Sequence, residues 1–476
     1  MSLRYHEVAP ILAGLEKKFQ ADIAELKVEG WSLWPILRIR IAHSLLPSDP
    51  PNTGQAIQTH AGKERRRVRL LYLRSFFELI FLILRGGARK KVMTRTLTYN
   101  RRETWQNKKY CVFFDQLIQD MDRKHFIVSE GRGFEPHRYE RDVPNKVDFH
   151  DDFVVPLARL FSPWMKYRLR SELSNLKRIS ERIHPGSSDS IADTALDFAK
   201  KYHAWRWIYR LLKPESVLVS VAPYKREAEI AALRSLGIPV YEYQHGEMTS
   251  YDLSYCYSPA MKNLKAVLPI PDRMFLFGKQ QEQVFLDAGF WTRDQLEVTG
   301  TPQIYSSERR GVQAYPYDPA FLNVLVTPSA LQQVPSGLRD FIGSYIESTQ
   351  ALRYRFYIKP HPSERHEDWF EFAEKYRDRV FVVSGNLHSL IKGAHVQLGV
   401  FTSCFHEGFH WNLPAYVLKA GPWEMALPLI HAGSARLIPT DFRGEFERFE
   451  VPALERDRFM TVDPVRLKAL LFRSHR

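Results

Sequence analysis

Cysteine is scarce in this sequence of 476 residues, and the few cysteines are scattered. Cys111, Cys256 and Cys404 form no CxxC pair and no even-numbered set. Zinc sites built from thiolates need clustered ligands, and secreted disulfide scaffolds need paired cysteines, so both classes are excluded. We therefore expect a protein that works in a reducing compartment.

Long apolar runs are missing as well. The first residues lack the uninterrupted apolar core of a signal peptide, so we expect no secretion. The most apolar stretch, Leu70–Leu84, is interrupted by Arg74 and Glu78, whereas a transmembrane helix needs ~20 apolar residues. This stretch is the centre of a basic block, Lys63–Lys91. We expect the block to be either an interfacial helix on an anionic membrane surface or a buried helix with solvated ends.

Acidic residues are outnumbered, because 68 Lys and Arg oppose 54 Asp and Glu, giving a net charge of +14. A basic protein favours anionic partners such as nucleic acid, phosphorylated metabolites or an acidic membrane face. We expect no nucleic acid partner, because no zinc finger, RNP-like strand or tandem basic helices are present. The length exceeds the size at which single hydrophobic cores stop growing, so we expect two domains.

Hydrophobic periodicity divides the chain into four regions. Residues 1–95 are expected to be helical and basic. Residues 96–305 hold a first series of alternating strands and helices, which begins with an expected strand at Tyr110–Gln116. A second series occupies residues 306–441, and residues 442–476 form a tail with a helix near its end. Such alternation implies parallel sheets. We predict the α/β class, with two Rossmann-like domains facing across a cleft and a helical N-terminal extension.

A histidine follows one of the expected strands, in the segment Gln244-His245-Gly246. Ligands of open α/β sheets bind beyond the carboxyl ends of the strands. Glycine permits close approach of a ligand, and an imidazole can take a proton from a hydroxyl group. We predict His245 as the catalytic base, and its neighbours Gln244, Gly246 and Glu247 as acceptor-side residues. The alternative is a structural turn.

A second polar loop, Lys359-Pro360-His361-Pro362-Ser363-Glu364, follows a strand of the second series. The prolines on both sides of His361 restrict the backbone and delay the next helix. His361 could then donate to a phosphate oxygen, with charge added by Lys359. We predict His361 as catalytic and Lys359, Pro362 and Ser363 as nucleotide-binding; the alternative is a rigid loop with an incidental histidine.

A third strand runs into Thr402 and Ser403 and then into a helix that contains Glu407 and Gly408. Free backbone N–H groups at a helix start bind anions, and a carboxylate can accept from a ribose diol. We predict all four residues on the donor side. The alternative is an ordinary helix cap with Glu407 as its capping-box partner.

An acidic DxD triplet, Asp120-Met121-Asp122, lies in a helical-looking segment. We expect a solvated helix face there rather than a metal site. No metal and no cofactor is expected.

Taken together, these segments resemble the GT-B glycosyltransferases of bacterial surface polysaccharides. The similar branches are the capsule and lipopolysaccharide sialyl- and Kdo-transferases and the teichoic-acid glycerophosphotransferases. The resemblance covers about Val217–Leu429. It is carried by the KPHP loop, the Thr402-Ser403 pair, Glu407-Gly408, the turn Val298–Gln303 with Gly300 and Thr301 on the donor side, and Gln244-His245-Gly246. At the last position the sialyltransferases have an acidic pair before glycine, so this sequence departs from them.

The resemblance implies an inverting, metal-independent glycosyltransferase that uses a nucleotide-sugar donor, with a CMP-sugar favoured. The acceptor would be a lipid-linked or glycan chain of a growing surface polysaccharide. The enzyme would be cytoplasmic and peripheral on the inner face of the cytoplasmic membrane, reaching it through Lys63–Lys91. Three alternatives stay open: a glycerophosphotransferase with a CDP-glycerol-like donor, a UDP-sugar 2-epimerase, and a non-catalytic assembly protein on the same fold.

Overall fold

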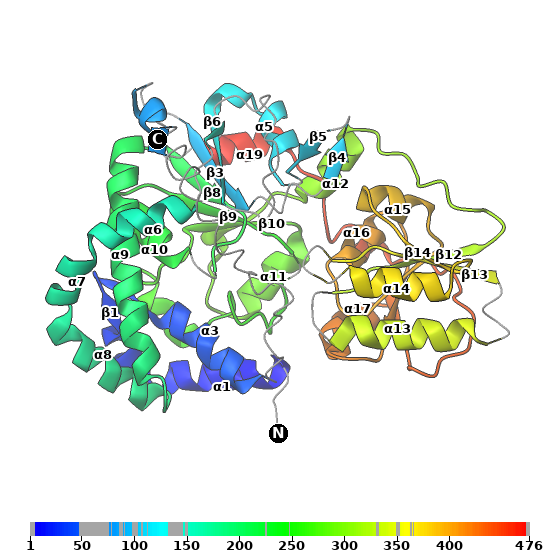
Figure 1. The fold of residues 1–476 in the computed structure, drawn as a ribbon, viewed down its shortest axis with the longest axis horizontal. Helices are drawn as coiled ribbons and strands as arrows, with labels where there is room; N and C mark the ends of the chain where they lie inside the picture. The colour runs from blue at the N-terminus through cyan, green and yellow to red at the C-terminus, as the bar shows by residue number, and fades with distance from the viewer. Residues whose placement is uncertain are drawn as a thin grey trace.

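The protein forms two lobes that lie side by side (Figure 1). A computed structural model describes residues 5–46, 76–77, 79–84, 89, 91–97, 103–105, 108–111, 113–131, 146–147, 151–223, 226–246, 248–329, 333–348, 353–361, 364 and 366–472. The first lobe is built around a seven-stranded sheet and the second around a six-stranded sheet.

The sheet of the first lobe is parallel throughout and has the order β11-β10-β9-β8-β3-β6-β7. Its first strand in the chain, β3, therefore lies between β6 and β8, and the winding reverses there. This is the Rossmann order 3-2-1-4-5-6 with one strand added at the edge. Its strands are β3 (Val92–Leu97), β6 (Phe126–Gly131), β7 (Lys146–Val147), β8 (Ser216–Val219), β9 (Val240–Tyr243), β10 (Arg273–Leu276) and β11 (Leu296–Val298).

The sheet of the second lobe repeats the same order. It reads β14-β13-β12-β15-β16-β17, again parallel, with the reversal between β12 and β15. Two doubly wound sheets confirm the expected fold class, α/β with two Rossmann-like domains. The strands are β12 (Leu322–Val326), β13 (Tyr354–Ile358), β14 (Val380–Val382), β15 (Val396–Gly399), β16 (Ala415–Leu418) and β17 (Ala435–Ile438).

Helices cover both sheets (Figure 1). Those of the first lobe are α1 (Tyr5–Lys18), α2 (Gln20–Glu25), α3 (Trp34–Leu45), α5 (Asp115–Asp120), α6 (Asp151–Leu160), α7 (Ser162–Arg168), α8 (Arg170–Ile183), α9 (Ser188–Leu212), α10 (Glu227–Ser235), α11 (Lys279–Asp287) and α12 (Pro302–Arg309). Those that follow are α13 (Gln333–Ile346), α14 (Glu367–Lys375), α15 (Leu387–Gly393), α16 (Cys404–His410), α17 (Leu427–His431), α18 (Ala453–Arg456) and α19 (Pro464–Leu471).

The N-terminal helices are part of the first lobe. Apolar residues of α1 to α3 belong to the same buried core as residues of α9, α10 and β8. A buried ion pair fixes α1 to α3, because Nε of Arg38 lies 2.7 Å from Oε1 of Glu16. The same carboxylate oxygen accepts from the indole N–H of Trp34 at 2.9 Å. Residues 5–46 therefore contribute to the wall of this lobe.

The prediction of a strand at Tyr110–Gln116 is wrong. Lys108–Tyr110 is the second strand (β5) of a small antiparallel hairpin with β4 (Glu103–Trp105), and a turn leads from it into α5. Three strands of the first sheet were missed by the sequence analysis: β3, β6 and β7. Arg95 of β3 is fully buried, and its Nε lies 2.8 Å from Oε1 of Glu229 on α10. A charged residue therefore occupies a central strand, and its ion-pair partner comes from a helix that packs on the sheet.

The C-terminal segment returns to the first lobe. Gly278 and Gly300 make room for it, because a Cβ at Gly278 would lie 1.7 Å from the carbonyl oxygen of Arg458, and one at Gly300 2.3 Å from that of Thr461. Gly300 also has a φ of +93°, a conformation that favours glycine. The chain then enters α19, drawn in red beside β3 and β6 in Figure 1.

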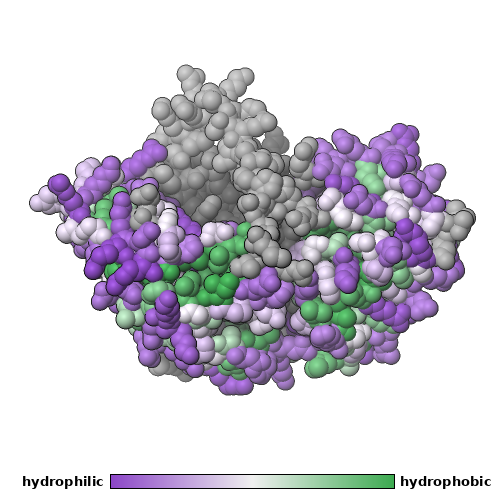
Figure 2. All heavy atoms as spheres, turned by 90° about the horizontal axis from the view of Figure 1, so that it is seen from below, coloured by the Kyte–Doolittle hydropathy of each residue, from purple (hydrophilic) through white to green (hydrophobic). Residues whose placement is uncertain are grey.

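Hydrophilic residues dominate the face shown in Figure 2, with a hydrophobic patch on the first lobe. In the described part of the block Lys63–Lys91, the helical residues 76–77 and 79–84 bury Leu79 and expose Phe77, Phe81 and Leu84. Arg65–Arg67 lie outside the described residues. Among the helices that the structure describes, none has the length and apolar character to cross a membrane.

Candidate functional site

His245 lies directly beyond the carboxyl end of β9, where the sequence analysis expects it. Its side chain is 35% exposed. Its Nδ1 lies 3.5 Å from the hydroxyl oxygen of Tyr255 and 4.0 Å from Oε1 of Glu242. Within the described residues Nε2 has no hydrogen-bond partner, so this nitrogen is available to a substrate.

Glu242 lies on β9, three residues before His245, and is fully buried. Its Oε1 accepts from the backbone N–H of Ala222 at 3.0 Å and from the hydroxyl of Tyr255. Its Oε2 is buried without a partner in the described residues. Tyr255 thus lies between Glu242 and His245 and contacts both side chains.

The environment favours the neutral form of Glu242. Burial raises its pKa to about 8 and Asp252 also raises it, while hydrogen bonds from Tyr255 and Ala222 and the charge of Arg226 lower it. The protonated form of the carboxyl group is therefore favoured near neutral pH. Since Oε1 accepts two hydrogen bonds, that proton belongs on Oε2.

The environment also favours neutral His245. Burial lowers its pKa to about 4. The side chain is one-third exposed, so desolvation is incomplete, and the lowered pKa leaves the imidazole neutral at pH 7 and able to accept a proton. A neutral imidazole at a strand end is suited to general base catalysis.

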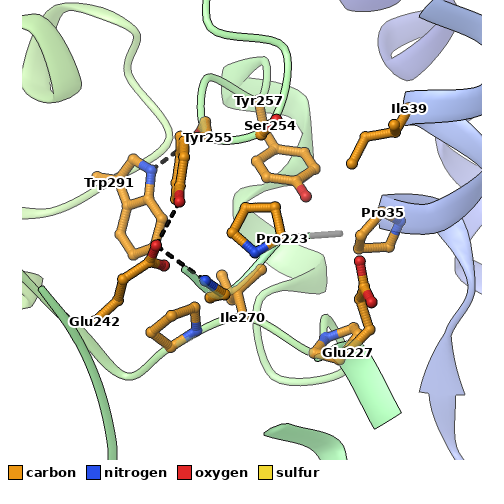
Figure 3. A pocket seen from close by; sticks show the side chains of 13 residues that line it. Pro35, Ile39, Pro223, Glu227, Glu242, Ser254, Tyr255, Tyr257, Ile270 and Trp291 are labelled. Carbon is orange, nitrogen blue, oxygen red and sulfur yellow. Dashed lines mark hydrogen bonds between the residues drawn. The ribbon is translucent and has the colours of Figure 1, made fainter. Parts of the chain in front are cut away.

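A narrow pocket lies against the Glu242–Tyr255 side of this cluster (Figure 3). Its cavity volume is about 20 Å³, and its wall includes Pro35 and Ile39 of α3 as well as Trp291. A water molecule needs ~10–15 Å³, so the space suits about one water rather than a sugar ring. His245 does not line this pocket and reaches it only through Tyr255 and Glu242.

Gln244, expected on the acceptor side, is fully buried, and its side chain hydrogen-bonds to the protein itself. Its Oε1 accepts from the backbone N–H of Phe277 at 2.8 Å, and its Nε2 donates to the carbonyl oxygen of Gly246 at 2.7 Å. Nε2 also lies 3.2 Å from Oε1 of Gln281. With these bonds the side chain of Gln244 holds the His245 loop against β10 and α11. Gly246 is half-buried in that loop, and Glu247 lies outside the described residues.

The predicted donor residues lie at the carboxyl edge of the second sheet. His361 follows β13, and Thr402 and Ser403 follow β15; β12 lies between these two strands. His361 is exposed, while the amine of Lys359 donates to the carbonyl oxygen of Gly385 at 2.7 Å. An ammonium has three donors, so this bond leaves others for an anion. Pro362 and Ser363 lie outside the described residues.

The side chain of Glu364 stabilises the loop after β13 through two hydrogen bonds. The backbone N–H of His361 donates to Oε1 of Glu364 at 3.2 Å, and the indole N–H of Trp369 donates to Oε2 at 2.8 Å. Burial raises the pKa of Glu364 to about 7, although both hydrogen bonds lower it. The turn that presents His361 is therefore held by side chains as well as by proline.

The hydroxyl of Thr402 accepts from the backbone N–H of Cys404 at 3.3 Å. Thr402 precedes the N-cap residue Ser403, so this bond holds the turn before α16. Ser403 is half-exposed beside it and makes no capping bond.

Glu407 does not complete a capping box. Its Oε2 lies 2.8 Å from Nε2 of His388, and both side chains are buried. Gly408 allows α16 to approach the sheet, because a Cβ there would lie 2.4 Å from Oε1 of Gln397. In this conformation Glu407 and Gly408 pack inside the second lobe.

Gly300 and Thr301, also predicted on the donor side, lie on the first lobe under the returning C-terminal segment. The backbone N–H of Thr301 donates to the carbonyl oxygen of Met460 at 2.5 Å, and the hydroxyl of Tyr243 donates to that of Gly300 at 3.0 Å. The sequence pattern of this turn is thus explained by the closely packed crossing of the chain.

The helix expected around Asp120-Met121-Asp122 ends at Asp120, since Met121 is its buried C-cap residue and Asp122 has a φ of +76°. Oδ2 of Asp120 accepts from the hydroxyl of Tyr305 at 2.7 Å. Within the described ranges no group of three or more His, Cys, Asp or Glu side chains is placed to hold a metal ion.

Three relevant residues were missed by sequence reasoning. Glu242 and Tyr255 contact His245 from a buried strand and from a loop. Ser329 follows β12 at the reversal point of the second sheet, and its hydroxyl is buried without a partner among the described residues. A Glu inside the apolar run Val240–Tyr243 was the available signal, whereas Tyr255 and Ser329 had none.

No protein-family model matches the sequence, and no curated protein does. Solved structures of similar fold include a UDP-GlcNAc 2-epimerase of Methanocaldococcus jannaschii in complex with UDP-GlcNAc and UDP, at 11% identity and a TM-score of 0.46, covering 80% of this chain and 99% of that one. A UDP-GlcNAc 2-epimerase of Neisseria meningitidis matches at 15% identity and a TM-score of 0.40, covering 74% of this chain and 88% of that one. The wall teichoic acid polymerase TagF matches at 8% identity and a TM-score of 0.36, covering 75% of this chain and 80% of that one. Similarity at this level does not distinguish one activity from another.

Proposed function

We propose that the chain is an inverting, metal-independent glycosyltransferase. It moves a sugar from a nucleotide-activated donor, with a CMP-sugar favoured, to a hydroxyl group of a growing bacterial surface polysaccharide. The observation that carries the proposal is His245: a neutral, partly exposed imidazole at a strand end, with Nδ1 directed at Tyr255 and Nε2 unpartnered in the described structure.

In the proposed reaction Nε2 of His245 takes the proton of the acceptor hydroxyl. The hydroxyl oxygen attacks the anomeric carbon of the donor from the side opposite the nucleotide, which inverts the configuration. Charge develops on the departing phosphate, and preorganised donors stabilise it. His361 and Ser403, at the carboxyl edge of the second sheet, have the exposure and chemistry for that role, and Lys359 adds charge.

The place of work is part of the same proposal. The acceptor would be lipid-linked or a glycan on such a carrier, at the inner face of the cytoplasmic membrane. Phe77, Phe81 and Leu84 are 57%, 60% and 77% exposed on the helix within the basic block Lys63–Lys91. Exposed aromatic and apolar side chains next to basic residues favour binding at an anionic interface.

A nucleotide panel tests the proposal first. CMP, CDP, UDP and GDP are added at high excess, and the cognate nucleotide should stabilise the protein by ~2.7 kcal/mol at a concentration of 100 Kd. A non-catalytic assembly protein should respond to none of them.

Turnover then separates the enzymes. The matching nucleotide-sugar should be consumed with transfer to a glycan acceptor, and this should persist in EDTA. A glycerophosphotransferase would instead use a CDP-glycerol-like donor, and an epimerase would convert a UDP-sugar without any acceptor. Activity lost in EDTA and restored by Mn²⁺ or Mg²⁺ would overturn the metal-independent reaction.

A further inference from the structure

We propose that Tyr255 and Glu242 form a proton relay behind His245, and that the pocket against Glu242 is the exit through which the proton reaches solvent. The relay rests on the proposed function only for the source of the proton, the acceptor hydroxyl. Its geometry belongs to the first lobe alone.

The first step is the direction of the hydrogen bonds. The hydroxyl of Tyr255 donates to Oε1 of Glu242, so its proton is committed. Its oxygen can then accept from Nδ1–H of His245, 3.5 Å away. This arrangement favours the tautomer of His245 with its proton on Nδ1, and it leaves the lone pair of Nε2 for the substrate.

The second step is the unpartnered oxygen of Glu242. Burying a carboxyl oxygen without a hydrogen bond costs free energy, and Oε2 is such an atom within the described structure. Glu242 lines the pocket together with Tyr255 (Figure 3). The volume of about 20 Å³ suits one water molecule, which could bond with Oε2. The pocket is partly open, and the half-buried Ile39 and Pro223 lie in its wall.

The proton steps balance without any further reactant. Glu242 first releases its Oε2 proton to the pocket water. The O–H bond of the acceptor then breaks and Nε2–H of His245 forms. Nδ1–H passes its proton to the Tyr255 oxygen while the Tyr255 proton passes to Oε1 of Glu242. Glu242 is then neutral again with the proton on Oε1, His245 is left as its Nε2–H tautomer, and the net change is one proton moved from the acceptor to solvent.

The charges around Glu242 come from several elements. Asp252 and Glu227 face the cluster with negative charge, and Arg226 opposes them. Burial raises the pKa of Glu242 to about 8, so its ionisation, and with it the basicity of His245, increases as pH rises through about 8.

The test is NMR of ¹⁵N-histidine-labelled full-length protein without any substrate. His245→Gln assigns the ring signals of His245. We expect the Nδ1–H tautomer and a chemical-shift inflection near pH 8 in the native protein. Glu242→Gln should remove the inflection, and Tyr255→Phe should remove the tautomer preference. An Nε2–H tautomer in the native protein, or an unchanged inflection in Glu242→Gln, would overturn the relay.

The exit is tested by filling the pocket. Ile39→Trp should slow exchange of the Nδ1–H proton with water roughly tenfold or more. Ile36→Trp, on the same helix but not in the pocket wall, is the matched control and should leave the rate unchanged. Equal rates in both variants would overturn the exit. Neither measurement uses a nucleotide-sugar donor. The relay can therefore fail while sugar transfer is observed, and the relay can be supported while sugar transfer is not observed.

Discussion

The carboxylate of Glu407 lies 2.8 Å from Nε2 of His388, and both side chains are buried in the second lobe. The indole N–H of Trp411 donates to Nδ1 of His388 at 3.0 Å, so Nε2 carries the ring proton and faces Glu407. The N–H does not align with the line between the two atoms, and the contact is chiefly electrostatic. A nucleotide ribose could reach Glu407 only after this pair separates.

A double-mutant cycle measures the Glu407–His388 contact. Glu407→Gln and His388→Gln should each lower stability, and the double variant should lose less than the sum, with a coupling of ~0.5–3 kcal/mol. Urea unfolding followed by tryptophan fluorescence provides the four values. Additive losses would mean that the two side chains act independently.

Replacing His245 tests the base. His245→Ala should cost roughly 10²–10⁴ in turnover while nucleotide affinity stays nearly unchanged, because a base acts on the acceptor. Steady-state kinetics and calorimetry provide the two readouts. His431→Ala, at an exposed position in α17, is the control. Near-normal turnover of His245→Ala would remove this residue from the mechanism.

The donor side is tested by removing its polar side chains. His361→Ala, and Thr402 and Ser403 both to Ala, should each weaken nucleotide binding, by ~1.5–3 kcal/mol per charged hydrogen bond. Calorimetry with the nucleotide identified in the panel provides the affinity. Ser174→Ala, exposed on α8, should bind normally. Unaltered affinity in both donor-side variants would contradict the phosphate assignment.

Glu242 should make stability depend on pH. Its pKa is raised from 4.5 to about 8 on folding, so between these values the folded chain binds a proton that the unfolded chain does not. Stability contributed by this group therefore falls as pH rises from about 4.5 to about 8. Glu242→Gln has no such group, and its Tm should decrease less over the same interval. Parallel Tm curves for the two proteins would show that Glu242 does not titrate as proposed.

Membrane binding is tested with vesicles. The native protein should sediment with anionic liposomes at low salt and be released by high salt. Phe77→Ser with Phe81→Ser should weaken binding, and changing Arg65–Arg67 to Gln should weaken it as well. Phe370→Ser, 54% exposed on α14 of the other lobe, should not. Protein that stays in the supernatant at low salt would exclude the block as a membrane contact.

The sequence predicted the sheets well where strands and helices alternate regularly. β8, β9 and β10 form in the regular part of the first series, where apolar runs end at clear turns. β3 was missed because polar residues such as Thr94 and Arg95 interrupt it. The buried charge of Arg95 is paired with that of Glu229, which lies more than a hundred residues later. Local periodicity holds no information on such a distant partner.

The site was predicted in part for a similar reason. His245 and His361 follow strands, and the positions of strand ends can be derived from the sequence. Glu407 was predicted as a ribose contact because a carboxylate can accept from a diol. In the structure it pairs with His388 on another helix, and its sequence neighbours do not indicate this partner. Tyr255 is ten residues from His245, and only the path of the intervening loop brings the two side chains together.

The return of the C-terminal segment has a consequence for folding during synthesis. Leu467, Leu470 and Leu471 of α19 belong to the same buried cluster as Val92 and Phe275 of the first lobe. That cluster stays incomplete until residue 471 has left the ribosome, whereas the last residue in the core clusters of the second lobe is Val451. The second lobe can therefore fold before the first is finished, although a nascent chain generally folds its N-terminal domain first. Until then the apolar side of the first sheet under α19 is open to chaperones.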